Sequence, residues 1–157
     1  MDQDWKKALR DSISEVFSTM FFMVPEDNPD LAAAPDKVSV AGWYQGSMDF
    51  SHPDAELEVT VCTPAEVARE LAANILAGED DELSAGQVLD CYGEMINMVA
   101  GGLLTAVDQK GEWKMGLPRK QVLKAGNAAQ LAAGKLHHQF LEVDGRPLVA
   151  AIARRGS

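Results

Sequence analysis

The sequence contains little cysteine, few basic residues and no long apolar run. Its two cysteines, Cys62 and Cys91, match no metal-binding or redox spacing, and we interpret both as buried free thiols in a reducing compartment. No apolar run approaches the roughly 20 residues of a membrane-spanning helix. The polar start of the chain also lacks the apolar core of a signal peptide. Together these absences predict a cytoplasmic protein.

The shortage of basic residues excludes two classes of partner. Lysine and arginine number 14 against 24 aspartates and glutamates, which gives a net charge of −10 at pH 7. Such an acidic chain is repelled by the phosphate backbone of nucleic acids and by anionic lipid surfaces. The 157 residues fit a single domain, 1–157, long enough to bury roughly 68–70% of its unfolded surface. We therefore expect a globular domain that binds neither nucleic acid nor membrane.

The first half of the chain predicts a helix followed by a pair of strands. A helix is expected over about 3–23, because apolar residues recur there at helical spacing. Its apolar face consists of Leu9, Ile13, Val16, Met20 and Val24. The segments 37–45 and 55–62 are rich in Val, Trp, Tyr and Thr, which is typical of strands. We expect the turn between these strands at 49–54.

Two capping patterns predict the starts of the next two helices. Thr63-Pro64-Ala65-Glu66 combines a capping box with proline at the first helical position, and predicts a helix that reaches Gly78. The acidic stretch 79–82 is typical of a solvated connection. Ser84-Ala85-Gly86-Gln87 is a second capping box. It predicts the start of the longest helix, which we expect to end near Val107.

Extended segments follow the longest helix. They are predicted at 113–118, 122–124, 135–143 and 147–154. Asp144-Gly145 separates the last two segments and is a strong hairpin signal. A long amphipathic helix followed by strands thus occurs twice in the chain. This order predicts a pseudo-duplication with halves at about 1–78 and 84–157.

The longest helix has two contrasting faces. Its apolar arc comprises Val88, Tyr92, Met95, Ile96, Val99, Leu103 and Ala106. The opposite stripe comprises Asp90, Glu94, Asn97, Gly101 and Thr105. Glu94 and Asn97 stand one turn apart and point the same way. By periodicity alone, this stripe is a solvated helix face.

Three details of the same helix favour a docking surface. Asparagine is a mediocre residue for a helix interior, because its amide competes for backbone hydrogen bonds. Gly93, Gly101 and Gly102 each cost roughly 1 kcal/mol relative to alanine, which suggests that something approaches the backbone closely. Met98 and Leu104 flank the polar stripe and place apolar groups beside it. A packed layer inside the protein itself explains these features equally well.

The stripe carries a family resemblance. Asp90-x-x-x-Glu94-x-x-Asn97, continued by Met98-Val99-Ala100-Gly101, resembles the signature helix of the CheX/CheC/FliY chemotaxis phosphatases. Gly116-Leu117-Pro118 resembles the segment that follows this helix in the family. The resemblance implies an α+β fold in which long helices pack on a mostly antiparallel sheet. It also implies a homodimer formed partly through sheet edges, and we expect the terminal strand at 147–153 to be such an edge.

The resemblance also implies an activity and its residues. The substrate would be the aspartyl phosphate of a CheY-like response regulator, where Mg²⁺ and a lysine of the regulator hold the phosphoryl group. Asn97 would orient the hydrolytic water, and Glu94 would pair with the regulator's lysine. The residues expected to dock the regulator around this pair are Asp90, Met98, Gly101 and Leu104. The chain itself would supply no metal or cofactor.

A weaker copy of the motif lies in the first helix. Asp11-x-x-x-Glu15-x-x-Ser18 repeats the spacing with serine in place of asparagine, so we expect a single active site in the second copy. Asp11 and Glu15 are interpreted as part of an ordinary exposed face. His137 and His138 are adjacent on a predicted strand and point to opposite faces, which argues against a shared metal ion.

Two other functions remain open at this stage. A non-catalytic adaptor would keep the docking helix but would not stimulate phosphate release, because fold does not guarantee activity. A structural subunit of a motility apparatus is the second alternative, since related domains occur in the flagellar switch. The short chain, without an added binding domain, argues against this second alternative.

Overall fold

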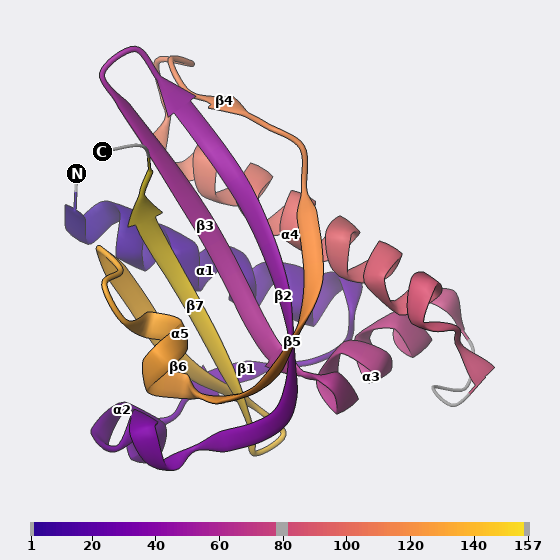
Figure 1. Ribbon diagram of the computed structural model, residues 1–157. Coiled ribbons are helices and arrows are strands. Elements are labelled where there is room, and N and C mark those ends of the chain that lie inside the picture. The colour runs from indigo at the N-terminus through magenta and orange to yellow at the C-terminus, as the bar shows by residue number, and fades with distance from the viewer. Residues whose placement is uncertain (1, 78–81, 156–157) are drawn as a thin grey trace.

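The structure, a computed structural model, describes residues 2–77 and 82–155 (Figure 1). The connection predicted at 79–82 therefore lies almost wholly outside the described residues. The elements are α1 (Asp2–Met20), β1 (Pro25–Asp27), α2 (Pro29–Ala33), η1 (Pro35–Lys37), β2 (Ser39–His52), β3 (Ala55–Pro64), α3 (Ala65–Leu76), α4 (Ala85–Val107), β4 (Lys114–Met115), β5 (Arg119–Asn127), α5 (Ala128–Ala132), β6 (His137–Val143) and β7 (Arg146–Arg154). None of the helices in this part of the chain is both long and apolar enough to cross a membrane.

The described residues form a seven-stranded antiparallel sheet, which confirms the predicted fold class. Its order is β1-β6-β7-β3-β2, with β4 and β5 both paired to the outer side of β2. The prediction that 147–153 is an edge strand is wrong, because β7 lies between β6 and β3. Its run Leu148–Ile152 is buried throughout, as expected for a strand covered on both faces. Homodimerisation stays a prediction.

Helices cover both faces of the sheet. In Figure 1, α1, α3 and α4 lie behind the sheet and the short helix α5 lies in front of it. The large core cluster fills the space between the sheet and the three long helices. A second cluster joins Leu31 of α2 and Ala128 of α5 to Trp43, Cys62 and Val149 of the sheet. Adjacent residues of one strand, such as Trp43 and Tyr44 of β2, therefore enter opposite layers.

Both cysteines are buried free thiols, as predicted. Cys62 belongs to the small cluster, and burial raises the pKa of its thiol to about 12. Cys91 lies on α4, where burial and then the charges of Asp90 and Glu94 raise the thiol pKa. Both thiols therefore stay protonated and unreactive at neutral pH.

The first helix ends earlier than predicted. The helix α1 stops at Met20, and Phe22 takes a left-handed conformation with φ of 58°. The amide of Met23 donates to the Phe17 carbonyl at 2.9 Å, which turns the chain out of the helix. Met20 and Val24 are therefore exposed, not buried as predicted. Their places in the core are taken by Phe17, Phe21 and Met23.

Phe22 combines strain with exposure and gives a stability prediction. Its side chain is 75% exposed, and a left-handed conformation costs a non-glycine residue roughly 1–2 kcal/mol. We expect Phe22→Gly to raise the free energy of unfolding by about 0.5–1 kcal/mol, after glycine's larger loss of chain entropy. Urea unfolding measures this change. Val24→Gly is the control, because Val24 is exposed in an ordinary conformation and should lose stability. Equal losses for both variants would contradict the argument.

Two local predictions near the first hairpin are wrong. The strand β2 runs on to His52, so the turn is Pro53-Asp54 and not 49–54; Met48 and Phe50 lie in the core and keep this stretch in the sheet. The capping box at 63–66 does not form, because Pro64 is itself the cap of α3 and makes no side-chain cap bond. Thr63 remains in β3.

Two other local predictions are confirmed. Ser84 and Gln87 form the reciprocal capping box of α4, with bonds of 2.9 and 3.1 Å. The helix ends at Val107, as expected. Asp144 and Gly145 both have positive φ, 52° and 78°, and form the tight turn between β6 and β7.

Candidate functional site

The helix α4 is held firmly on the sheet by its apolar face. Six of the seven predicted core residues are fully buried, namely Val88, Tyr92, Met95, Ile96, Val99 and Leu103. The Tyr92 hydroxyl donates to the Val61 carbonyl and lies 3.0 Å from the Thr63 hydroxyl, which ties α4 to β3. The seventh residue, Ala106, is exposed. It lines a groove at the end of α4 instead of facing the sheet.

The opposite face of α4 presents the predicted stripe to the outside. Asp90, Glu94, Asn97 and Thr105 are exposed, and Gly101 is partly exposed. Within residues 2–77 and 82–155, the side chains of Glu94 and Asn97 make no hydrogen bond or ion pair. The structure therefore brings these two side chains together on one surface, one turn apart on a rigid helix.

The helix α4 contains Gly86, Gly93, Gly101 and Gly102, and packing inside the protein explains two of these four glycines. A Cβ at Gly102 would lie 2.5 Å from the Ser12 hydroxyl oxygen of α1, and a Cβ at Gly93 would lie 3.2 Å from the Lys120 side chain. A Cβ at Gly101 would meet no described atom within 4 Å. Gly101, the glycine in the polar stripe, therefore has no neighbour among the described residues that would exclude a side chain.

Met98 and Leu104 are less exposed than the docking prediction implied. Both are half-buried and pack against the large core cluster. They contribute only an apolar margin to the stripe, because much of each side chain already has contacts within the protein. Asp90 is widely open, with 81% of its side chain exposed.

A basic residue lies beside the stripe, although no sequence pattern predicts it there. The Lys120 ammonium of β5 lies 3.7 Å from a carboxylate oxygen of Asp90. No short-range pattern connects a strand residue to a helix 30 positions earlier, so only the packing of β5 against α4 reveals this neighbour.

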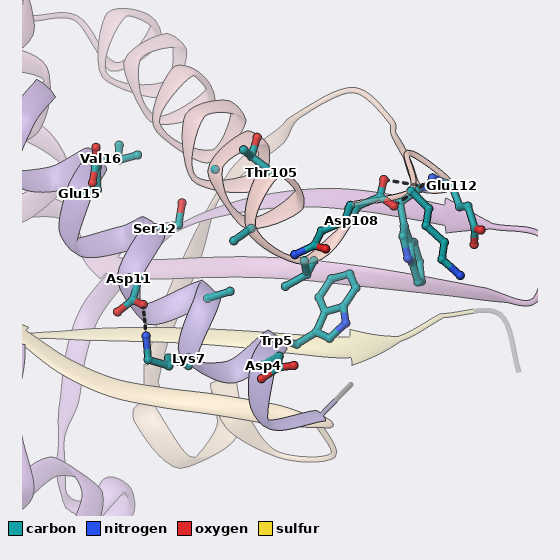
Figure 2. A pocket seen from close by; sticks show the side chains of 17 residues that line it. Asp4, Trp5, Lys7, Asp11, Ser12, Glu15, Val16, Thr105, Asp108 and Glu112 are labelled. Carbon is teal, nitrogen blue, oxygen red and sulfur yellow. Dashed lines mark hydrogen bonds and ion pairs between the residues drawn. The ribbon is translucent and has the colours of Figure 1, made fainter.

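An open groove of about 910 Å³ lies between α1 and the end of α4 (Figure 2). The weaker motif on α1 forms part of its wall, through Asp11 and Glu15. Asp11 is bound to Lys7 at 2.8 Å, as Figure 2 shows, and the Ser18 hydroxyl donates to the Ser14 carbonyl at 2.7 Å. Asp11 and Glu15 are exposed, as expected, and Ser18 is exposed as well. This copy offers no amide, and two of its polar groups already have partners.

Several polar groups of the groove already have partners within the protein. The Asp108 carboxylate accepts from the backbone amides of Glu112 and Trp113, and Glu112 pairs with His52 at 2.8 Å. Across the residues that the structure describes, no group of three or more His, Cys, Asp or Glu side chains converges as a metal site. The side chains best placed to act on a second protein are therefore those of the exposed Glu94 and Asn97 on α4.

The helix α4 lies within a region of the chain that matches a known protein family. A family model described as chemotaxis phosphatase CheX matches residues 44–140, which include all of α4. No curated protein matches the chain in sequence.

Solved structures of the same fold cover nearly the whole chain. Chemotaxis protein CheX from Vibrio vulnificus has a TM-score of 0.76 and 17% identity, over 97% of each chain. A CheC-like superfamily protein from Shewanella sp. PV-4 has a TM-score of 0.72 and 20% identity, over 99% of this chain and 100% of that one. A CheX–CheY–BeF3–Mg²⁺ complex from Borrelia burgdorferi has a TM-score of 0.68 and 17% identity, over 98% of this chain and 99% of that one.

Proposed function

Because the chain belongs to the CheX family of chemotaxis phosphatases, we propose that it hydrolyses the aspartyl phosphate of a CheY-like response regulator. Water attacks the phosphorus, the bond from phosphorus to the acyl oxygen breaks, and the products are inorganic phosphate and the regulator's carboxylate. The similar CheX of Borrelia burgdorferi is seen in complex with CheY, BeF3 and Mg²⁺, which supports a partner of this class.

One observation carries the proposal: Glu94 and Asn97 are exposed side by side on a rigid helix. The cap at Ser84 and the buried face of α4 fix the helix. Binding of a partner therefore costs little additional conformational entropy of the backbone. Neither side chain has a partner within the described residues, and both are therefore available to a second protein.

The amide of Asn97 suits the positioning of water. It both donates and accepts hydrogen bonds, and it carries no charge that must be stripped of solvent at the interface. In phosphoryl transfer most of the catalytic effect is positioning and charge stabilisation. The regulator's Mg²⁺ and lysine would supply the charge stabilisation. Asn97 would add the orientation of the water in line with the departing carboxylate.

Glu94 is assigned to docking, which gives a kinetic prediction. We expect Glu94→Ala to raise the KM for the phosphorylated regulator about tenfold and to change kcat little, because a charged pair sets register and engagement. Steady-state phosphate release against regulator concentration separates the two constants. Glu94→Gln keeps the shape and loses the charge, so it should behave like Glu94→Ala. A variant with unchanged KM and reduced kcat would place Glu94 in the chemical step instead.

The function itself is tested by incubating the protein with phosphorylated CheY-like regulators and following loss of the phosphate. We expect release faster than that of the regulator alone. Binding to a regulator without faster release would identify the chain as an adaptor and contradict the proposal.

A further inference from the structure

Lys120 lies against the flank of α4, next to the stripe that carries Glu94 and Asn97. Its Cδ would be 3.2 Å, and its Nζ 3.4 Å, from a Cβ built at Gly93, so the side chain crosses the helix where no side chain blocks it. The ammonium then lies 3.7 Å from the Asp90 carboxylate. The Lys120 side chain is 35% exposed, which leaves the charged end open to a second protein.

Two glycines bring this lysine to the helix. Lys120 of β5 is the register partner of Gly46 of β2. A Cβ at Gly46 would lie 3.0 Å from the Cβ of Ile96 and 3.3 Å from the Tyr92 ring, so the strand lies very close to α4 only because this residue is glycine. The strand partner Lys120 is thereby carried to the edge of α4, and Gly93 provides the space for its aliphatic part.

The charge of Lys120 is unusual at this surface. The neighbouring stripe carries the carboxylates of Asp90 and Glu94, and the whole chain has a net charge of −10. Among residues 2–77 and 82–155, the ion pair of Lys120 with Asp90 is the only one that involves α4. A phosphorylated regulator presents anionic oxygens, those of the acyl phosphate and of the carboxylates that hold its Mg²⁺, beside the lysine assigned to Glu94. A cation on this surface can pair with such an oxygen while Glu94 pairs with the lysine.

We propose that Lys120 is a docking residue of the phosphatase site, whose ammonium contacts an anionic oxygen of the regulator. Asp90 holds the side chain on the Gly93 surface before binding and so limits the rotamer freedom that docking must remove. This role rests on the proposed function, because it needs a regulator bound at the stripe. The anionic oxygen belongs either to the phosphoryl group or to a carboxylate at the rim of the regulator's site.

The central test is Lys120→Met, which keeps the aliphatic cover of Gly93 and removes the charge. We expect the KM for phosphorylated regulator to rise about twofold to fivefold, with kcat within a factor of two, as for an exposed charge pair. Added salt should also raise KM less in this variant than in the wild type, because salt screens the attractive pair that the variant lacks. Lys120→Arg should restore both values. A purely structural lysine would not change the salt dependence.

Lys124→Met is the matched control. Lys124 is also an exposed lysine of β5, and its register partner is also a glycine, Gly42. It makes no ion pair with a described residue. Both variants lose one positive charge, so a general effect of net charge would appear in both. An equal change in both variants, or an unchanged KM in Lys120→Met, overturns the docking role.

Binding measurements separate this inference from the function on which it rests. Kd is measured for the regulator with and without beryllium fluoride and Mg²⁺. If Lys120→Met raises the Kd only for the beryllofluoride form, the contact is with the phosphoryl group. If it raises the Kd for both forms, the contact is with a rim carboxylate. A wild type that binds without hydrolysis contradicts the phosphatase, while the Kd comparison still decides the role of Lys120. A wild-type protein that neither binds nor hydrolyses the regulator overturns both the docking role of Lys120 and the phosphatase function.

Discussion

Asn97→Ala is expected to lower the rate of stimulated phosphate release on the order of 10²–10³-fold, the usual effect of removing one positioned polar group. The amide is exposed and bonds to no described residue, so its removal leaves no buried group unsatisfied. Alanine is also the better helix former, and the variant should be more stable by up to roughly 0.5 kcal/mol. Lower activity with equal or higher stability separates a catalytic role from damage to the fold.

The measurement is single-turnover loss of phosphate from a regulator, with urea unfolding of each variant alongside. Thr105→Ala is the control on the same face of α4. The Thr105 hydroxyl is exposed and donates only to the Gly101 carbonyl of its own helix, at 2.9 Å. We expect this control to lose far less activity than Asn97→Ala, because Thr105 lies about two turns along α4 from Asn97. An Asn97→Ala variant as fast as wild type would remove the assignment of the amide, whatever the activity of the protein.

The sequence was informative about α4 because its signals are local. A reciprocal cap at Ser84, a 3.6-residue period and a long uninterrupted pattern act within a few residues of one another. The exposure of Glu94 and Asn97 follows from the same period, and the structure agrees with it. Ala106 shows the limit of this argument. Its angle on the helix is that of a core residue, but it is exposed and lines the groove between α4 and α1.

The failed predictions depend on distant parts of the chain. Thr63 resembles a helix cap, but pairing with β2 and the contact with Tyr92 keep it in β3. The position of β7 was mispredicted although its continuous apolar run, Leu148–Ile152, favours a central strand. Lys120 joins the site only through the register of β5 on β2. Strand order and register are set by tertiary contacts, which a local pattern does not contain.

Gly101 and Gly102 are adjacent in sequence and have opposite surroundings, so alanine should affect them in opposite directions. Gly102 faces α1, where the Ser12 hydroxyl donates to the Val99 carbonyl at 2.7 Å and a new Cβ would lie 2.5 Å from the same oxygen. We expect Gly102→Ala to lower the free energy of unfolding by about 1–3 kcal/mol, as overpacking does. Gly101 faces open space, and Gly101→Ala should raise it by up to about 1 kcal/mol.

A double-mutant cycle identifies the contact. With Ser12→Ala, the nearest Ser12 atom to the added methyl group is its Cβ at 3.5 Å, an ordinary packing distance. The Ser12→Ala/Gly102→Ala pair should therefore recover most of the loss, with an interaction energy of about 1–2 kcal/mol. Urea unfolding of the four proteins measures it. Additive effects would mean that Gly102→Ala destabilises the protein through a contact other than the one with Ser12.

The activity of Gly101→Ala then tests the stripe as a docking surface. The added methyl group meets nothing in the described protein, so any loss of phosphatase activity must arise from contact with the regulator. We expect this more stable variant to show a higher KM, because a partner that reaches Asn97 must also pass close to the backbone one turn further along α4. A Gly101→Ala protein with both higher stability and unchanged KM would show that the regulator does not approach α4 at this turn.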